Sequence, residues 1–495
     1  MQNNQDLGLQ DLALQDKQLI KNFSYINGSW HSSESQIVVT NPANGNEVAH
    51  ISNAGVVETE LAVKAAKDAL KMWSAKSANE RASLLRNWFN LMMQHQDDLG
   101  RILTVEQGKP LAEAKGEIAY GAAFIEWFAE EGKRVYGDVI PGPSGDKRII
   151  VIKQPVGVVA SITPWNFPNA MIARKAAAAL AAGCTFVVRP ATQTPLSALA
   201  MAELAERAGI PAGVFNVVVG DDSRGMGKVL TQHPDVAKFT FTGSTPVGKT
   251  LISQCASTVK KVSMELGGNA PFVVFDDADI DAAVQGAMVS KYRNAGQTCV
   301  CTNRIFVQKG VLEQFTEKFT AAVAALSIGD GLADGVSIGP MISSDAVNDV
   351  DKLVADSLAA GATLVLGGKR DSAGDNFYQP TILTGVTNDM PIACNEIFGP
   401  VSPIIAFDNE AEVIALANDT EYGLAAYFYS RDIGRIWRVA EGLEYGMVGI
   451  NEGIISNAAA PFGGVKQSGN GREGSKYGLD DYLEIKYLCM GGLDK

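Results

Sequence analysis

The chain is 495 residues long, which favours two or three domains over a single one. Its residues are 46% hydrophobic and 20% charged, which is an ordinary globular composition. The net charge of −13 argues against nucleic acid as a partner, because binding a phosphate backbone needs concentrated Lys and Arg. A small anion remains possible as a ligand, since a few well-placed cations can hold it.

No charge-free apolar run reaches about 18 residues, so we expect no membrane segment. The first twenty residues lack the basic start of a secretory signal and the Arg content of a transit peptide. We therefore expect a cytoplasmic protein in which residues 1–20 form an N-terminal tail, either mobile or with a short extra helix.

The predicted elements change character along the chain. Residues 57–133 repeat apolar residues at intervals of three and four, which predicts helices. The turn sequence PGPSG and the run RIIVIK then predict an exposed hairpin over 135–155. From residue 156 strands and helices alternate, with a helix over 168–182. Two later helices begin at Thr194-Pro195 and Thr245-Pro246, where each threonine hydroxyl is expected to cap its helix.

A second alternating series begins with the strand 271–275 and continues to about residue 460. The sequence therefore predicts an α/β fold in which two doubly wound parallel-sheet domains meet at a cleft. We place one domain in 21–134 and 156–265 and the other in 266–465. Because ligands of such sheets bind outside the carboxyl ends of the strands, we expect the loops described next to lie there.

The cysteine and histidine pattern does not favour metal chemistry. Cys299 and Cys301 lack the spacing of zinc knuckles, and the four histidines are scattered, so we expect no bound metal. The sequence Gly-x-Ser-x-Gly is absent, which argues against a hydrolase triad. We expect reduced thiols, because six cysteines are too few for a disulfide scaffold in a chain of this length: Cys184, Cys255, Cys299, Cys301, Cys394 and Cys489.

Three short segments carry candidate catalytic groups. Cys299 lies in NAGQTCVC (294–301), where backbone amides and positive charge favour a thiolate. Glu265 ends a predicted strand beside a Gly-Gly pair, where it is either a general base or a solvated turn residue. Asn166, in TPWNFP (163–168), has an amide suited to an oxyanion, although Trp165 and Phe167 beside it could equally be core residues.

A fourth feature, FTGSTPVG (241–248), opens a helix after a strand but lacks Gly-x-Gly-x-x-Gly. Either the helix amides at Ser244 and Thr245 bind phosphate, or Gly243 and Gly248 only permit close packing. Taken together, the four features describe oxidation of an aldehyde through a cysteine thioester, with hydride transfer to a nicotinamide and a glutamate that activates water.

At these residues the sequence resembles the aldehyde dehydrogenase superfamily. The shared motifs are TPWNFP, FTGST, MELGGNAPF, GQTC, EIFGP (396–400) and PFGGVKQSG (461–469). They occur in the family's order, and the resemblance spans about residues 22–490. It implies an aldehyde-dehydrogenase-like fold whose first domain binds the cofactor and whose second domain is catalytic. It also implies a homodimer or homotetramer, joined through 135–155 and 480–495 as oligomerisation segments.

Within the family the chain is most similar to the succinate-semialdehyde dehydrogenases, in the segments KYRNAGQTCVC, NEGIISN and GREGSKYGLDDYLEIKY. This resemblance implies oxidation of succinate semialdehyde to succinate with NAD(P)+. Its expected catalytic residues are Cys299 as nucleophile, Glu265 as general base and Asn166 as oxyanion donor. Glu396 and Phe398 would contact the nicotinamide ribose and ring. The other expected cofactor contacts are Thr163, Pro164, Trp165, Arg189, Ala191, Thr192, Gly243, Ser244, Gly248 and Leu266.

Arg174, Arg293 and Ser456 are expected to hold the distal carboxylate of the substrate. Two guanidinium groups would select an anionic aldehyde over a neutral one through charge-assisted hydrogen bonds. For Arg293 the alternative is a cation that stabilises the carboxyl end of a helix.

Two departures from the family pattern concern the cofactor. Arg189 stands where the family usually has Lys, and Thr192 stands where many NAD-preferring members have Glu. A threonine and an arginine can donate to a 2′-phosphate that a glutamate would repel. We therefore expect NADP to be preferred, with NAD as the second cofactor.

Three alternatives remain open from the sequence. The natural substrate is either succinate semialdehyde or another ω-carboxy aldehyde such as glutarate semialdehyde, since one methylene changes discrimination by only about 1–3 kcal/mol. A thiol esterase that uses Cys299 and Glu265 without a cofactor is the candidate from another class. Cys301 is either a packing residue or a redox partner that forms a reversible disulfide with Cys299.

Overall fold

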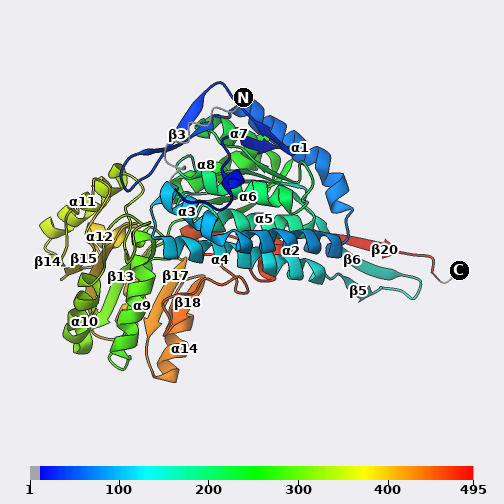
Figure 1. Ribbon diagram of the computed structural model, residues 1–495. Coiled ribbons are helices and arrows are strands. Elements are labelled where there is room, and N and C mark those ends of the chain that lie inside the picture. Colours follow the sequence, from blue (N-terminus) through cyan, green and yellow to red (C-terminus); the bar gives the residue numbers. More distant parts are fainter. Residues whose placement is uncertain (1–11, 494–495) are drawn as a thin grey trace.

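The computed structural model describes residues 12–493 and contains two large sheets (Figure 1). Residues 1–11 of the expected tail and residues 494–495 lie outside this range. The first sheet is parallel except where β1, β2 and β19 join it. Its strand order is β19 (Gly469–Asn470), β11 (Lys261–Glu265), β10 (Val236–Thr242), β7 (Val158–Ile162), β8 (Thr185–Arg189), β9 (Phe215–Val217), β1 (Ser24–Ile26) and β2 (Ser29–His31).

The second sheet is parallel except for its edge strand β14. Its order is β14 (Thr363–Leu366), β15 (Thr381–Thr384), β16 (Val401–Phe407), β13 (Thr302–Gln308), β12 (Ala270–Val274), β17 (Ala425–Tyr429) and β18 (Met447–Ile450). The expected α/β fold with two doubly wound sheets is confirmed. Two strands near the amino end, β3 (Gln36–Thr40) and β4 (Glu47–Ser52), form a separate ribbon.

Helices cover both sheets (Figure 1). With the first sheet belong α1 (Val56–Ser74), α2 (Ala78–Gln94), α3 (Gln96–Gln107), α4 (Leu111–Glu131), α5 (Ala170–Ala182), α6 (Pro195–Arg207), α7 (Ser223–Gln232), α8 (Thr245–Cys255) and α15 (Tyr477–Asp480). With the second belong α9 (Ile280–Tyr292), α10 (Leu312–Ala324), α11 (Ser344–Ala359), α12 (Pro391–Cys394), α13 (Glu410–Asn418) and α14 (Ile433–Gly442). Within residues 12–493, no helix is both long and apolar enough to cross a membrane.

The predicted hairpin forms β5 (Asp138–Pro141) and β6 (Arg148–Pro155), and it projects from the body of the molecule (Figure 1). A strand from the carboxyl end of the chain, β20 (Leu483–Met490), pairs antiparallel with β6 along its whole length. Segments 135–155 and 480–493 therefore make one three-stranded arm.

Part of the expected tail is instead packed against the first domain. Leu12, Leu14 and Leu19 are buried, and the carboxylate of Asp98 on α3 accepts hydrogen bonds from the main-chain N–H groups of residues 15 and 16 at 3.0 and 2.8 Å. The prediction of a mobile tail is wrong for residues 12–20, because their leucines pack into the core, and the alternative of a short helix is met by the single 3-10 turn Lys17–Leu19.

The two predicted threonine caps are also wrong. The hydroxyl of Thr194 is buried and has no hydrogen-bond partner among the described residues. The first free N–H groups of α6, those of Leu196 and Ser197, donate instead to the carboxylate of Glu106 on α3, at 2.7 and 2.8 Å. A carboxylate from a neighbouring helix thus replaces the local cap and complements the helix dipole. At α8 the N-cap is Ser244, and the Thr245 hydroxyl lies 3.3 Å from Gly267 N.

The cleft between the sheets lies at opposite strand ends in the two domains. β11 ends at Glu265 and β12 begins at Ala270, so the chain passes directly from the carboxyl end of one sheet to the amino end of the other. The expected location of the loops is therefore right for the first sheet and wrong for the second.

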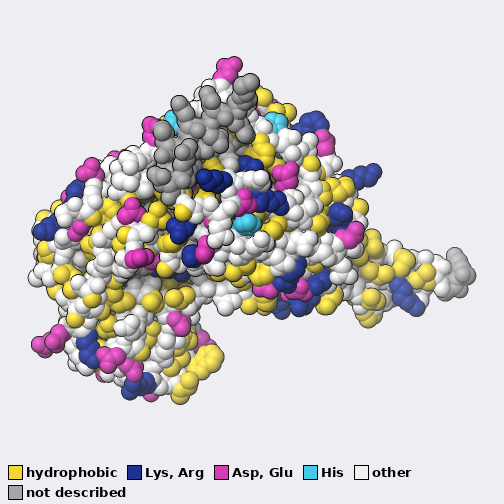
Figure 2. All heavy atoms as spheres, in the orientation of Figure 1, with side chains coloured by type: hydrophobic (Ala, Val, Ile, Leu, Met, Phe, Trp, Pro, Cys, Tyr) yellow, Lys and Arg dark blue, Asp and Glu magenta, His cyan; other side chains and the backbone are white. Residues whose placement is uncertain are grey.

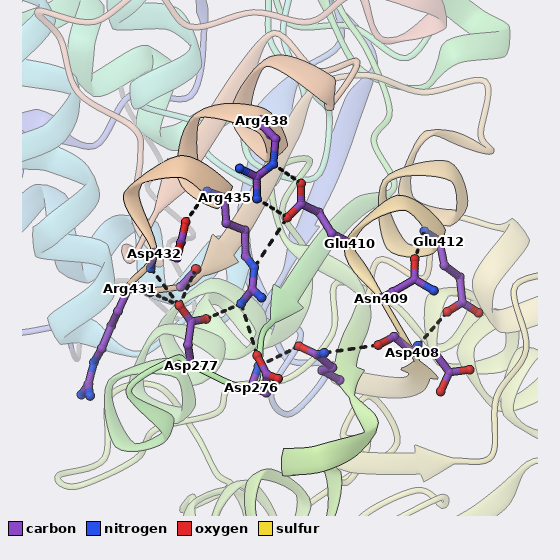
Figure 3. Close-up of polar contacts among 12 residues, drawn as sticks. Asp276, Asp277, Asp408, Asn409, Glu410, Glu412, Arg431, Asp432, Arg435 and Arg438 are labelled. Atoms are coloured by element: carbon purple, nitrogen blue, oxygen red, sulfur yellow. Dashed lines mark hydrogen bonds and ion pairs between the residues drawn. The ribbon is translucent and has the colours of Figure 1, made fainter.

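At the carboxyl ends of β12 and β17, the position expected for a ligand, the second sheet carries an ion-pair cluster (Figure 3). Arg435 on α14 donates to Asp277 at 2.7 Å and to Asp276 at 3.2 Å. Arg438 binds both oxygens of Glu410 on α13, at 2.6 and 2.8 Å. These contacts fasten α13 and α14 to this end of the sheet.

The capping geometry predicts different effects of two substitutions at the start of α6. Glu106→Ala should lower the free energy of unfolding by about 1–2 kcal/mol or more, because two buried N–H groups lose their acceptor. Thr194→Val should change it by less than about 0.5 kcal/mol, because the hydroxyl caps nothing. Thermal unfolding midpoints of both variants and the parent measure this; a larger drop for Thr194→Val would contradict the assignment.

Candidate active site

A cavity of about 270 Å³ lies in the cleft. From the first sheet its walls come from the segments after β7, β10 and β11, and from the second sheet they come from the segments before β13 and β16. The residues predicted from sequence that line it are Pro164, Trp165, Asn166, Arg174, Gly243, Ser244, Leu266, Arg293, Glu396, Phe398, Cys299 and Ser456. Thr163, Arg189, Ala191, Thr192, Gly248, Glu265 and Cys301 are not among its lining residues.

Cys299 lies half-buried in the loop before β13. Burial raises the pKa of its thiol to about 12, and the nearby Arg174 guanidinium opposes this rise. This direction is opposite to that of the favoured thiolate expected from the sequence. Gly268, beyond β11, packs against this loop so closely that a Cβ there would lie 2.4 Å from the carbonyl oxygen of Cys299. Only glycine lets the two segments approach in this way.

Asn166 faces the cavity from the segment after β7. Its Nδ2 donates to the carbonyl of Gln297 at 3.0 Å, and one hydrogen of the amide remains for another acceptor. The main-chain N–H of Cys299 donates to no acceptor within residues 12–493. An amide hydrogen and a main-chain N–H beside one thiol are the donors that an oxyanion needs.

Glu265 ends β11, but its carboxyl group does not form part of the cavity wall. Both oxygens are buried without a hydrogen-bond partner among the described residues. Burial raises the pKa of Glu265 well above its usual value, and the negative Glu473 carboxylate adds to this, while Arg174 and Lys175 oppose it. A carboxylate with a raised pKa is a stronger base, which suits proton abstraction from water.

Glu473 forms the centre of a buried charge cluster beside the cavity. It accepts hydrogen bonds from Arg174 Nε and Lys175 Nζ, and all three side chains are almost completely buried. The two cations lower the pKa of Glu473 despite its burial. The motif GREGSKYG contains Glu473, but neither it nor Lys175 was assigned a role from the sequence.

The two arginines of the expected carboxylate site lie against aromatic rings. The guanidinium carbon of Arg174 is 4.0 Å from the ring centre of Phe462, and that of Arg293 is 5.4 Å from the ring centre of Phe167. Arg174 Nη2 is buried without a partner in the described part of the chain. Stacking fixes each guanidinium plane while its N–H edge remains available to an anion.

Tyr120, on α4, is a lining residue that the sequence analysis missed. Its hydroxyl is buried and makes no well-formed hydrogen bond with any described residue. Burial raises the pKa of Tyr120, whereas Arg174, Arg293 and Ser456, which line the same cavity, lower it. The other missed lining residues are Phe167, Met171, Thr242, Gly267, Thr298, Val300 and Phe462.

The opposite side of the cavity carries the expected cofactor residues. Trp165 and Phe398 pack edge to face with ring centres 5.6 Å apart. Glu396 accepts a hydrogen bond from Gly268 N at 3.0 Å, and burial raises the pKa of Glu396 to about 7. Ser244 makes no side-chain cap on α8, so the first N–H groups of that helix stay open to an anion.

The expected adenosine contacts lie outside this cavity. Arg189 Nη2 donates to the carbonyl of Gly220 at 2.8 Å, and its Nε has no partner in residues 12–493. Thr192 is half-buried, with its hydroxyl 3.4 Å from the Gln193 amide oxygen. A Cβ at Gly248 would lie 2.4 Å from Leu266, so Gly248 permits close packing of α8.

Cys301 is buried behind the loop, and its Sγ donates to the carbonyl of Lys291 at 3.1 Å. Both it and Cys299 are free thiols. A disulfide between them, which stays a prediction, requires Cys301 to leave this contact. Within residues 12–493, no group of three or more His, Cys, Asp or Glu side chains has an arrangement that holds a metal ion.

The comparisons with known proteins agree with this geometry. The aldehyde dehydrogenase family model matches residues 30–488. The chain is 62% identical to 3-sulfolactaldehyde dehydrogenase of Pseudomonas putida, over 98% of this chain and all of that protein. It is 61% identical to the NADP(+) succinate-semialdehyde dehydrogenase of Escherichia coli (strain K12), over 97% of this chain and all of that one.

A glutarate-semialdehyde dehydrogenase of Pseudomonas aeruginosa is 59% identical, over 97% of this chain and all of the relative. Among solved structures, an NADP-dependent enzyme of E. coli superposes with a TM-score of 0.96 at 61% identity, covering 97% of this chain and all of that chain. The expected resemblance is confirmed over nearly the whole chain: this protein belongs to the aldehyde dehydrogenase family.

Proposed function

We propose that this enzyme oxidises an aldehyde that carries an anionic group at its far end, with succinate semialdehyde as the first candidate. One observation carries the proposal: within residues 12–493 the buried Arg174 Nη2 has no acceptor, and it belongs to a cavity that is also lined by Arg293, Tyr120 and Cys299. Buried donors are rarely left unpaired, so an anionic ligand accounts for them.

The chemistry follows from the residues at the other end of the substrate. The sulfur of Cys299 attacks the aldehyde carbon while the thiol proton passes to water, and the Asn166 amide with the Cys299 N–H holds the resulting oxyanion. A nicotinamide bound beside Glu396 and Phe398 would supply the hydride acceptor that aldehyde oxidation needs. Glu265 then takes a proton from the water that hydrolyses the thioester, which releases the acid and restores the thiol.

The residues present fit a nicotinamide dinucleotide. Gly267 leaves room beside Glu396, since a Cβ there would lie 2.7 Å from Glu396 Oε2. We propose that Glu396 and Phe398 hold the nicotinamide ribose and ring, while the open start of α8 receives the phosphates. Support for NADP as the preferred form comes from Thr192 and Arg189, and from the NADP(+) specificity in the name of the E. coli relative.

The chain length of the natural substrate is the finer question. The three relatives are named for sulfolactaldehyde, succinate semialdehyde and glutarate semialdehyde, all of which combine an aldehyde with a distal anion. Because one methylene changes discrimination by only about 1–3 kcal/mol, we expect glutarate semialdehyde to be a second substrate.

We also propose that the three-stranded arm joins a second copy of this chain. Val139 on β5 and Ile485 and Tyr487 on β20 are 78%, 72% and 59% exposed, and apolar side chains are visible along the arm (Figure 2). Exposed apolar residues at alternate positions of a strand mark a surface that another chain covers.

A substrate panel with Tyr120→Phe tests the anion site. We expect the parent enzyme to favour succinate semialdehyde over neutral aldehydes of similar size by about 100-fold in kcat/KM, as two charge-assisted hydrogen bonds imply. Tyr120→Phe should raise KM for the semialdehyde about tenfold and leave neutral aldehydes unchanged. Tyr378→Phe, in a buried tyrosine bound to Asp351, is the matched control. Equal turnover of neutral and anionic aldehydes by the parent would exclude the proposal. Hydrolysis of an ester substrate without a nicotinamide, with no aldehyde oxidation when the nicotinamide is added, would favour an esterase.

Thr192→Glu tests cofactor preference. The new carboxylate should repel a 2′-phosphate and accept from the ribose hydroxyls of NAD, so the NADP/NAD ratio of kcat/KM should fall at least about tenfold. Gln193→Glu, which places the same charge on the exposed neighbouring residue, should leave the ratio nearly unchanged. An unaltered ratio in Thr192→Glu rules out this assignment.

Sedimentation velocity tests whether the three-stranded arm joins two copies of this chain. Ile485→Asp combined with Tyr487→Asp should shift the protein to monomers, because two charges would lie in a contact between apolar side chains. Lys486→Asp, on the other face of β20, is the control and should keep the assembly. A parent enzyme that sediments as a monomer contradicts the proposed role of the arm.

A further inference from the structure

A buried lysine contacts the segment that carries Asn166. Lys109 lies in the turn between α3 and α4, and its side chain is 1% exposed. Its Nζ is 2.7 Å from Glu117 Oε2 and 2.7 Å from the main-chain oxygen of Asn166. The same ammonium group lies 3.9 Å from the ring centre of Phe167. Lys109 thus contacts Asn166 and the residue after it, yet it does not line the cavity.

Glu117, the partner of Lys109, holds the same segment on its other side. Its Oε1 accepts hydrogen bonds from the main-chain N–H groups of Asn169 and Ala170 at 2.9 and 3.2 Å, which are at the start of α5. One ion pair therefore fixes the chain immediately before and immediately after the bend that leads from β7 into α5.

Asn294 completes the contact from the other domain. Its Nδ2 lies 3.0 Å from the main-chain oxygen of Asn166 and 3.3 Å from that of Gln297, which is also the acceptor of the Asn166 side chain. Gln107 Nε2 donates to Asn294 Oδ1 at 2.9 Å and so fixes the orientation of the amide. Asn294 has φ 53°, a left-handed conformation that asparagine tolerates better than most residues.

A buried ion pair is weak as a source of stability, because removing two charges from water costs about as much as their attraction returns. Here the Lys109 ammonium group donates a hydrogen bond to the main-chain oxygen of Asn166, which also accepts one from the Asn294 amide. Two donors on one carbonyl fix the peptide plane of Asn166, and with it the direction of the side chain that leaves the same Cα. Oxyanion donors are effective only when they are held in place before the charge develops.

We propose that Lys109, together with Glu117 and Asn294, is a positioning residue that aligns the Asn166 amide with the Cys299 main-chain N–H. The inference rests on the proposed role of Asn166 as oxyanion donor. It adds that the alignment comes from both domains and from a buried charge outside the cavity.

A double-mutant cycle tests the inference. Asn166→Ala should lower kcat about 10²–10³-fold, the usual effect of losing one oxyanion donor. Lys109→Met should lower kcat about tenfold or more, with KM for aldehyde and cofactor nearly unchanged. Because Lys109 acts through Asn166, the kcat of the double variant Lys109→Met with Asn166→Ala should lie within about twofold of the kcat of Asn166→Ala alone.

Lys238→Met is the control, since Lys238 is equally buried but donates to Ser263 in the first sheet. Any fold-loss of kcat in Lys238→Met should multiply with the fold-loss in Asn166→Ala when the two substitutions are combined. Asn294→Gly keeps the left-handed backbone and deletes the amide that donates to the Asn166 carbonyl. It gives a second test that does not depend on how Lys109→Met folds.

The outcomes separate the two proposals. If Asn166→Ala keeps full kcat, the oxyanion role is wrong and this inference falls with it. The positioning role is wrong if Asn166→Ala loses activity while folded Lys109→Met and Asn294→Gly keep full kcat. It is also wrong if the kcat losses of Lys109→Met and Asn294→Gly multiply with the loss of Asn166→Ala. In both cases the proposed function stands.

Discussion

The active-site wall depends on two buried glutamates that hold the first turns of two helices. Glu106 binds the start of α6, and Glu117 binds the start of α5. Both side chains come from the helical layer formed by α3 and α4 and reach the starts of α5 and α6, just after β7 and β8. They accept the free N–H groups at these two helix starts from within the protein, whereas the start of α8 has no side-chain cap.

Much of this arrangement follows from the sequence, because short loops between strong periodic elements can be located from their residues. Cys299 and Asn166 were predicted from such loops and Glu396 from the family resemblance, and all three reach one cavity. The orientation of the second sheet was not predictable in the same way. It results from the short passage between β11 and β12, which places the amino ends of the second sheet against the carboxyl ends of the first.

The residues that sequence reasoning missed share a physical cause. Tyr120 and Lys109 belong to the segment whose apolar periodicity indicates helices packed against a core, and nothing local distinguishes a polar group that serves a site from one on a solvated face. Their roles come from contacts with residues far away in the chain, such as Asn166 and Arg174. For Glu265 the sequence predicted the position at the end of β11 correctly, but not that its carboxyl group is buried outside the cavity wall, beside the charges of Arg174, Lys175 and Glu473.

The carboxyl-terminal segment leaves the second sheet, adds β19 to the edge of the first and brings Glu473 to Arg174 and Lys175. The two sheets are consequently not two separable modules. A fragment cut in the passage after Glu265 would keep both cations in its interior and lose the carboxylate between them. The part of the chain that builds the first sheet therefore cannot be transplanted as a continuous piece; an exchange between relatives has to carry the carboxyl-terminal segment with Glu473 along with it.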